Sequence, residues 1–182
     1  MNLEYTKIDG LVILKPIILK DDRGCFIESF NQINVNKLLG NTNFVQDNES
    51  ESFRGVLRGL HFQKPPYAQS KLVRCVKGKV LDVALDIRKK SKTYGQFESR
   101  ILSGDNKEQL FIPKGFAHGF IVLSESAIFS YKVDNYYNHM SECGVVWNDS
   151  NLNIDWKILK SKIIISKKDK RLSTFSSLKS PF

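Results

Sequence analysis

Short runs of apolar and β-branched residues recur along most of this chain, and the pattern predicts β-strands. Glycine, proline, serine or asparagine separates one run from the next. Many short strands at close spacing predict an all-β sandwich or barrel. The strands are expected at residues 12–19, 72–76, 80–87, 97–102, 109–112, 119–123 and 127–133, and Pro16 makes the first an edge strand.

Two of these strands are predicted to form a hairpin. The turn Lys77-Gly78-Lys79 separates residues 72–76 from residues 80–87. In the second strand the side chains alternate between two faces, with Leu81, Val83, Leu85 and Ile87 on one face and Asp82, Ala84 and Asp86 on the other. Helix is expected only at residues 32–39 and around residues 154–160. Residues 172–182 are expected to be a frayed end.

Composition fits one soluble globular domain spanning residues 1–182. The chain is 41% hydrophobic and 26% charged, and it has no apolar run of membrane-spanning length. Its first residues lack a basic and apolar leader, so a cytoplasmic location is expected. The three cysteines lie far apart and are odd in number, which predicts neither a disulfide framework nor a zinc site.

The net charge of +9 is concentrated near the end of the chain. Residues 157–182 hold eight Lys or Arg and one acid, Asp169, which gives +7, whereas the rest of the chain carries 20 basic and 18 acidic residues. Aromatic residues do not alternate with these lysines, and no nucleic-acid motif accompanies them. A solvated tail, or a basic rim that attracts a phosphorylated small molecule, is therefore expected rather than a nucleic-acid site.

Two of the three histidines lie in segments that could face one pocket. His61 stands between Leu60 and Phe62 and points away from both in a strand, and His118 follows a turn marked by proline and glycine. A histidine in an apolar pocket binds a metal or carries a proton. A metal site needs three or four ligands, and Gln63 stands where a His-x-His pair would need a second histidine. The sequence therefore favours acid–base chemistry, with no metal.

Several motifs, spread over roughly residues 8–170 and in the same order, resemble the dTDP-4-dehydrorhamnose 3,5-epimerase family. Each motif is weak alone, but the set is specific. The motifs are Asp22-Arg23-Gly24-Cys25-Phe26-Ile27-Glu28, Gln46-Asp47-Asn48, Leu57-Arg58-Gly59-Leu60-His61-Phe62-Gln63, Lys71-Leu72-Val73-Arg74, Ile112-Pro113-Lys114-Gly115-Phe116-Ala117-His118-Gly119-Phe120, Tyr131-Lys132, Tyr136-Tyr137, Trp147-Asn148-Asp149 and Ile154-Asp155-Trp156.

The resemblance implies a cupin-type jelly roll, a homodimer and a reaction without a cofactor. In a 4-keto-6-deoxy sugar nucleotide, C3 and C5 both lie next to the ketone. Removing either hydrogen gives an enolate, and reprotonation from the opposite face inverts the carbon, which requires a base, an acid and positive charge at the ketone oxygen. His61 is the expected base and Tyr131 the expected acid, with Lys71 at the oxygen. Asp169 is implied as the partner that orients His61.

The resemblance also implies residues that hold a dTDP-4-keto-6-deoxy sugar. Arg23, Arg58 and Lys168 are expected to pair with its diphosphate. Further polar groups are expected at the nucleoside, with one aromatic ring stacked on the thymine. These are Glu28, Gln46 and Asn48 for the base and ribose, and Tyr137 for the ring, while His118 and Glu142 match family positions near the sugar or diphosphate.

Other readings of these residues stay open at this point. Asp169 lies between two lysines and could be a solvated charge, while Lys71 and Arg58 could be ordinary surface cations. Tyr131 could be a core residue, since Phe129 lies on the same face. The alternative functions are a relative that inverts only C3 or isomerises the ketone of another sugar nucleotide, a metal-dependent cupin oxygenase, and a non-catalytic sugar-binding cupin.

Overall fold

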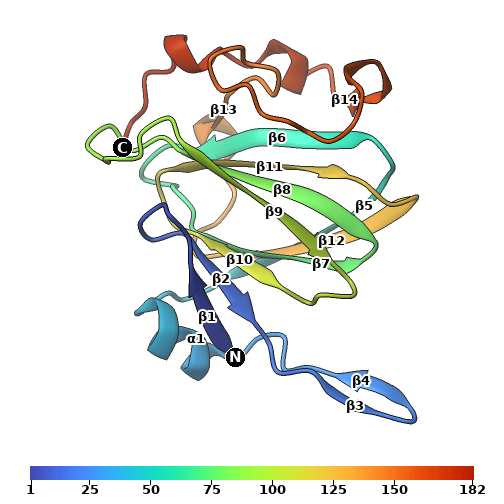
Figure 1. Cartoon of the computed structure of the whole chain (residues 1–182). Helices are drawn as coiled ribbons and strands as arrows, with labels where there is room; N and C mark the ends of the chain where they lie inside the picture. Colours follow the sequence, from blue (N-terminus) through green and yellow to red (C-terminus); the bar gives the residue numbers. More distant parts are fainter.

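The computed structural model describes residues 1–182 and is built from two antiparallel sheets that face each other (Figure 1). In the first sheet the strand order is β1 (Asn2–Tyr5), β2 (Val12–Lys15), β10 (Gln109–Ile112), β7 (Lys71–Lys77), β12 (Ser126–Val133) and β5 (Gln46–Phe53). In the second it is β13 (Glu142–Gly144), β6 (Val56–Gln63), β11 (Phe116–Val122), β8 (Lys79–Asp86) and β9 (Phe97–Ser103), and β14 (Ile164–Ile165) adds to β6 in parallel. This two-sheet architecture confirms the predicted all-β fold.

Three apolar clusters explain why the inner strands are buried on both faces. The largest lies between the sheets and includes Val73 and Phe129 from one and Phe120 from the other. A second covers the outer face of the second sheet, where Leu81, Val83 and Leu85 project as the alternation predicts. A third cluster, on the outer face of the first sheet, packs against α1 (Gln32–Leu39).

The predicted hairpin at Lys77-Gly78-Lys79 is wrong. The turn exists, but β7 pairs with β10 and β12, whereas β8 pairs with β9 and β11, so the chain crosses from one sheet to the other. The alternation of side chains would be the same in either arrangement. The predicted edge position of residues 12–19 is also wrong, because β2 lies between β1 and β10 and ends before Pro16.

One of the two expected helices is present. α1 covers residues 32–39, and the Asn31 side chain caps it by accepting hydrogen bonds from the backbone N–H groups of Ile33 and Asn34. Residues 154–160 are not an α-helix. The Asp155 side chain instead accepts a hydrogen bond from the backbone N–H of Lys157, which has a φ of 61°, a conformation that interrupts a helix.

The segment 172–182 is packed rather than frayed. It contains the short 3₁₀ turn Phe175–Ser177, and Phe175, Leu178 and Phe182 pack against the outer cluster of the second sheet. Ser180 is buried and donates a hydrogen bond to the carbonyl of Ile87. Apolar contacts with a distant sheet thus order a segment whose local sequence is polar. No helix in the structure has the length and apolar character needed to span a membrane.

A hairpin of β3 (Leu19–Asp21) and β4 (Gly24–Phe26) extends away from the two sheets (Figure 1). We call it, together with the residues up to Ser29, the arm. Its strands pair only with each other. Leu19 and Phe26 are 59% and 69% exposed, an unusual environment for large apolar side chains.

Candidate functional site

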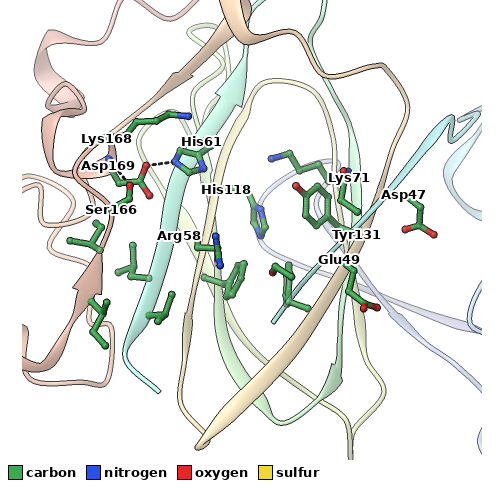
Figure 2. Close-up of a pocket in the computed structure, with 18 residues that line it drawn as sticks. Asp47, Glu49, Arg58, His61, Lys71, His118, Tyr131, Ser166, Lys168 and Asp169 are labelled. Carbon is green, nitrogen blue, oxygen red and sulfur yellow. Dashed lines mark hydrogen bonds and ion pairs between the residues drawn. The ribbon is translucent and has the colours of Figure 1, made fainter. Parts of the chain in front are cut away.

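A cavity of about 810 Å³ opens between the two sheets, and strands of both sheets line it. Residues 164–169 of the C-terminal segment form another part of its wall. Thirteen residues are predicted above as site residues, and the fold brings eight of them here from six separate parts of the chain. These are Asn48, Arg58, His61, Lys71, His118, Tyr131, Lys168 and Asp169 (Figure 2).

His61 forms a dyad with Asp169, although 108 positions separate them in the chain. His61 Nε2 lies 2.7 Å from Asp169 Oδ1, so Nδ1 is the ring nitrogen left free. The backbone N–H of Gly59 donates to Asp169 Oδ2, and the Ser166 hydroxyl accepts a hydrogen bond from the backbone N–H of Asp169. Burial alone would raise the pKa of Asp169, but the hydrogen bond and charge of His61 bring it below its ordinary value. Asp169 is therefore a buried, ionised partner for His61, not a solvated charge.

His118 forms a second pair with a carboxylate that the sequence analysis does not single out. His118 and His61 are directly opposite each other in the pairing of β11 with β6. His118 Nε2 lies 2.8 Å from Oδ2 of Asp82, whose side chain is fully buried. Burial lowers the pKa of His118 despite the nearby carboxylate, which favours the neutral imidazole. The only sequence evidence for Asp82 was its place on the face of the predicted strand 80–87 opposite Leu81 and Val83.

Lys71 and Tyr131 occupy neighbouring strands, β7 and β12. The Lys71 ammonium lies 5.8 Å from the centre of the Tyr131 ring. Burial lowers the pKa of Lys71 to about 8 and raises the pKa of the Tyr131 hydroxyl. Figure 2 shows His61 and Tyr131 on either side of His118, with Lys71 extending between them. At neutral pH the cavity therefore holds a protonated phenol, a cation and a carboxylate-bound imidazole.

Three further predicted residues do not line the cavity but are hydrogen-bonded to residues that do, directly or through one another. Glu142 Oε2 lies 2.5 Å from Lys168 Nζ and accepts a 2.8 Å hydrogen bond from the Tyr137 hydroxyl. The bond to Glu142 raises the pKa of Lys168. Gln46 donates to the side chain of Asn48 at 2.8 Å and accepts from the backbone N–H of Tyr137. One hydrogen-bonded chain thus connects β5, β13 and the C-terminal segment.

Two predicted substrate-binding residues lie away from the cavity within one chain. Arg23 is on the arm, where its guanidinium pairs with Asp21 at 2.5 Å. Glu28 is also on the arm and accepts hydrogen bonds from Asn31 and Asn34. Both belong to a segment that extends from the body, so a single chain does not bring them to the other eleven.

The cavity also contains residues that sequence reasoning missed. Asp47 and Glu49 line it from β5, and Ser166 lines it from the C-terminal segment. Asp47 stands within the motif Gln46-Asp47-Asn48, and Glu49 and Ser166 lie one or two positions from residues that the resemblance identifies, which is the only sequence evidence for them. No three His, Cys, Asp or Glu side chains are grouped so as to hold a metal ion. The groups present are suited to proton transfer beside a polarised carbonyl.

Comparison with known proteins agrees with this geometry. The family model of dTDP-4-dehydrorhamnose 3,5-epimerase matches residues 5–177. The enzyme of that name from Escherichia coli strain K12 is 54% identical over 179 residues, which cover 98% of this chain and 96% of the relative.

Solved structures extend the likeness to the fold. The dTDP-6-deoxy-D-glucose-3,5-epimerase of Legionella pneumophila, in complex with dTDP-4-keto-L-rhamnose, superimposes with a TM-score of 0.93 at 47% identity, covering 97% of this chain and 94% of that one. ChmJ, a 3′-monoepimerase from Streptomyces bikiniensis in complex with dTDP-quinovose, gives 0.88 at 29% identity, with 94% and 86% covered. The cavity, its His–Asp dyad and these matches lead to one conclusion: the chain belongs to the dTDP-4-dehydrorhamnose 3,5-epimerase family.

Proposed function

We propose that this chain epimerises C3 and C5 of dTDP-4-dehydro-6-deoxy-D-glucose to give dTDP-4-dehydro-L-rhamnose. The observation that carries the proposal is the single cavity in which the His61–Asp169 dyad, Tyr131 and Lys71 meet. The similarity to enzymes named for this reaction supports it. The chain is thus an isomerase that needs only acid–base groups for its chemistry.

His61 is the base in this proposal. Because its Nε2 is bound to Asp169, Nδ1 is the nitrogen that takes the proton from the carbon next to the ketone. The ring becomes an imidazolium, and the adjacent carboxylate stabilises that charge. The lowered pKa of Asp169 keeps the carboxylate ionised at neutral pH, so the partner is in the required state before substrate arrives.

Lys71 and Tyr131 complete the exchange of the proton. As the carbon loses its proton, negative charge develops on the ketone oxygen, and the Lys71 ammonium stabilises it. With a pKa of about 8, Lys71 remains mostly protonated at neutral pH. Tyr131, whose raised pKa keeps its hydroxyl protonated, supplies the new proton from the side opposite His61. The product therefore has the inverted configuration.

The remaining predicted residues of the cavity and its surroundings bind the substrate. Arg58 and Lys168 pair with the diphosphate, and His118 lies at the sugar. Gln46, Asn48 and the Tyr137 ring hold the nucleoside. Glu142, which bonds both Lys168 and Tyr137, keeps these two side chains next to each other beside the cavity.

A homodimer is the assembly that fits the arm. Leu19 and Phe26 are exposed in one chain, and a second copy would cover them. The arm also carries Arg23 and Glu28, which the family resemblance assigns to the substrate but which lie away from their own cavity. The arm of one subunit would then complete the cavity of its partner.

The three cysteines are free, which fits a reducing compartment such as the cytoplasm.

Mixing two impaired variants, at a substrate concentration too low for Arg23→Ala to turn over, tests the exchanged arm. Arg23→Ala is expected to weaken the diphosphate site, and His61→Asn to remove the base. In a mixed dimer, the cavity that keeps His61 receives the unaltered Arg23 from its partner, so one of the two sites is complete. Co-expressed and co-purified mixed dimers should recover about half of the wild-type activity per dimer. Activity no higher than the mean of the two parent variants would show that Arg23 does not serve the partner's cavity.

Proton NMR in deuterated water tests the proposed reaction directly. With dTDP-4-dehydro-6-deoxy-D-glucose as substrate, deuterium should enter at both C3 and C5, because both positions lie next to the ketone. The product signals should match dTDP-4-dehydro-L-rhamnose. The similarity to a 3′-monoepimerase makes epimerisation at C3 alone the second candidate function. Deuterium at C3 only would establish that candidate and overturn the double epimerisation.

A further inference from the structure

The guanidinium of Arg58 is held by a neutral group rather than by a carboxylate. Arg58 projects from β6, and its Nε and Nη2 donate hydrogen bonds of 3.2 and 3.0 Å to the hydroxyl of Ser52 on β5. The two strands belong to different sheets, so this interaction connects the sheets beside the cavity. Ser52 is 4% exposed, which leaves its hydroxyl little freedom to move. Arg58 is therefore fixed in place without a counter-charge.

One of the other two lysine or arginine side chains of the cavity, Lys168, differs from Arg58 in this respect. Lys168 already forms an ion pair with Glu142. Lys71 is a cation of lowered pKa at the reacting end of the cavity. Arg58 has no carboxylate within ion-pair distance, whereas Arg23, Arg88 and Arg100 each pair with one. An anion that enters the cavity can therefore bind the Arg58 guanidinium without displacing a carboxylate.

Ser52 belongs to a row of inward-facing polar side chains on β5. Alternate residues of this strand, Gln46, Asn48, Ser50 and Ser52, are less exposed than those between them. Gln46 and Asn48 bond each other, and Ser52 bonds Arg58. The Ser50 hydroxyl is buried and has no partner. The row thus provides two serines two positions apart, of which only one holds an arginine.

We propose that Ser52 is a positioning residue for the diphosphate of the substrate. It fixes the Arg58 guanidinium by hydrogen bonding from the edge of the opposite sheet, and it leaves the full charge available because a hydroxyl carries none. The proposal rests on the proposed function, in which Arg58 binds the diphosphate. A carboxylate at position 52 would also hold Arg58, but it would compete with the substrate for the guanidinium.

Binding of thymidine diphosphate and of thymidine to Ser52→Ala tests the role. Without its acceptor the guanidinium is free to rotate, and part of its interaction with the diphosphate is lost. Calorimetry should give about 10-fold weaker binding of thymidine diphosphate, as for one hydrogen bond to a charged group, and unchanged binding of thymidine. In turnover, KM should rise by a similar factor while kcat stays within about twofold of wild type.

Three further variants separate positioning from a merely structural role. Ser50→Ala is the neighbouring contrast, since it removes a buried hydroxyl of the same row that lines the cavity but holds no arginine, and any loss of thymidine diphosphate binding should be smaller than in Ser52→Ala. Ser52→Thr keeps the hydroxyl and should restore most of the affinity. Ser52→Asp should bind thymidine diphosphate more weakly than Ser52→Ala, because its carboxylate neutralises Arg58.

The proposal has clear contrary outcomes. Equal losses for thymidine and thymidine diphosphate in Ser52→Ala would show a general disturbance of the cavity. Ser52→Asp that binds thymidine diphosphate as tightly as Ser52→Ala or wild type would show that the missing counter-charge does not matter. Failure of the proposed function is separate, because it would appear as wild-type protein that binds the nucleotide but leaves the sugar unchanged in the NMR experiment.

Discussion

Replacing His61 with asparagine is expected to lower kcat by about 10³-fold or more, the largest loss of any single change in this chain. General acid–base groups contribute on the order of 10²–10⁴ in rate, and here one imidazole serves both C3 and C5. Asparagine is polar but shorter than histidine and ends before the Nε2 position that bonds Asp169, so a binding control is needed to show that the cavity keeps its shape. The rate should be measured by proton NMR under substrate saturation.

Two companion measurements make the His61 result decisive. Thymidine diphosphate should bind His61→Asn as it binds wild type, because the base is not assigned to the nucleotide. Asp169→Asn should also reduce kcat, but less, since it removes the orienting charge and leaves the imidazole. If His61→Asn retains a tenth or more of wild-type turnover, another group abstracts the proton, and the dyad is structural.

Replacing Tyr131 with phenylalanine is expected to separate proton removal from inversion. The change deletes only the hydroxyl, and the ring still packs against the inner core. His61 can then remove and return a proton on its own face, so deuterium should still enter the sugar. Formation of the epimerised product should fall by about 10²-fold or more, because no acid serves the opposite face.

The ratio of exchange to product is the informative quantity for Tyr131→Phe. Wild type should form product about as fast as it exchanges deuterium, whereas the variant should exchange many times for each product formed. Lys71→Ala is a useful contrast, because loss of the cation at the ketone oxygen should slow exchange and product formation together. Product formed by Tyr131→Phe at the wild-type rate would assign the proton donor to a different group.

The chemistry of this site was more readily predicted than its architecture. His61 and His118 stand in short segments marked by glycine or proline, and both lie in the cavity as expected. The Lys77-Gly78-Lys79 turn was located correctly, but alternation of side chains does not reveal which sheet the next strand joins. The alternation separated Asp82 from Leu81 and Val83, but it did not show which of the two faces of the strand lies between the sheets. The pairing of Asp82 with His118 depends on the sheet register, which one sequence does not encode locally.

Other failures have the same origin in distant contacts. The polar composition of residues 172–182 suggested a frayed end, yet a few apolar side chains anchor them to the outer face of the second sheet. Apolar spacing at residues 154–160 suggested a helix, but Asp155 forms a local turn with Lys157. For Arg23 and Glu28 the fold of one chain is what falls short. It places both residues away from the site to which the resemblance assigns them.

Because Asp169 lies 108 positions after His61 in the chain, the catalytic dyad can form only late in synthesis. A ribosome makes residue 169 after both sheets have been synthesised, and chains begin to fold from their first-made parts. A chain that ends after β13 would contain all but one of the catalytic groups and still lack the carboxylate of the dyad. Full catalytic activity would therefore be reached only when the C-terminal segment has docked on β6, which makes the rise of turnover to its final rate a marker for the end of folding.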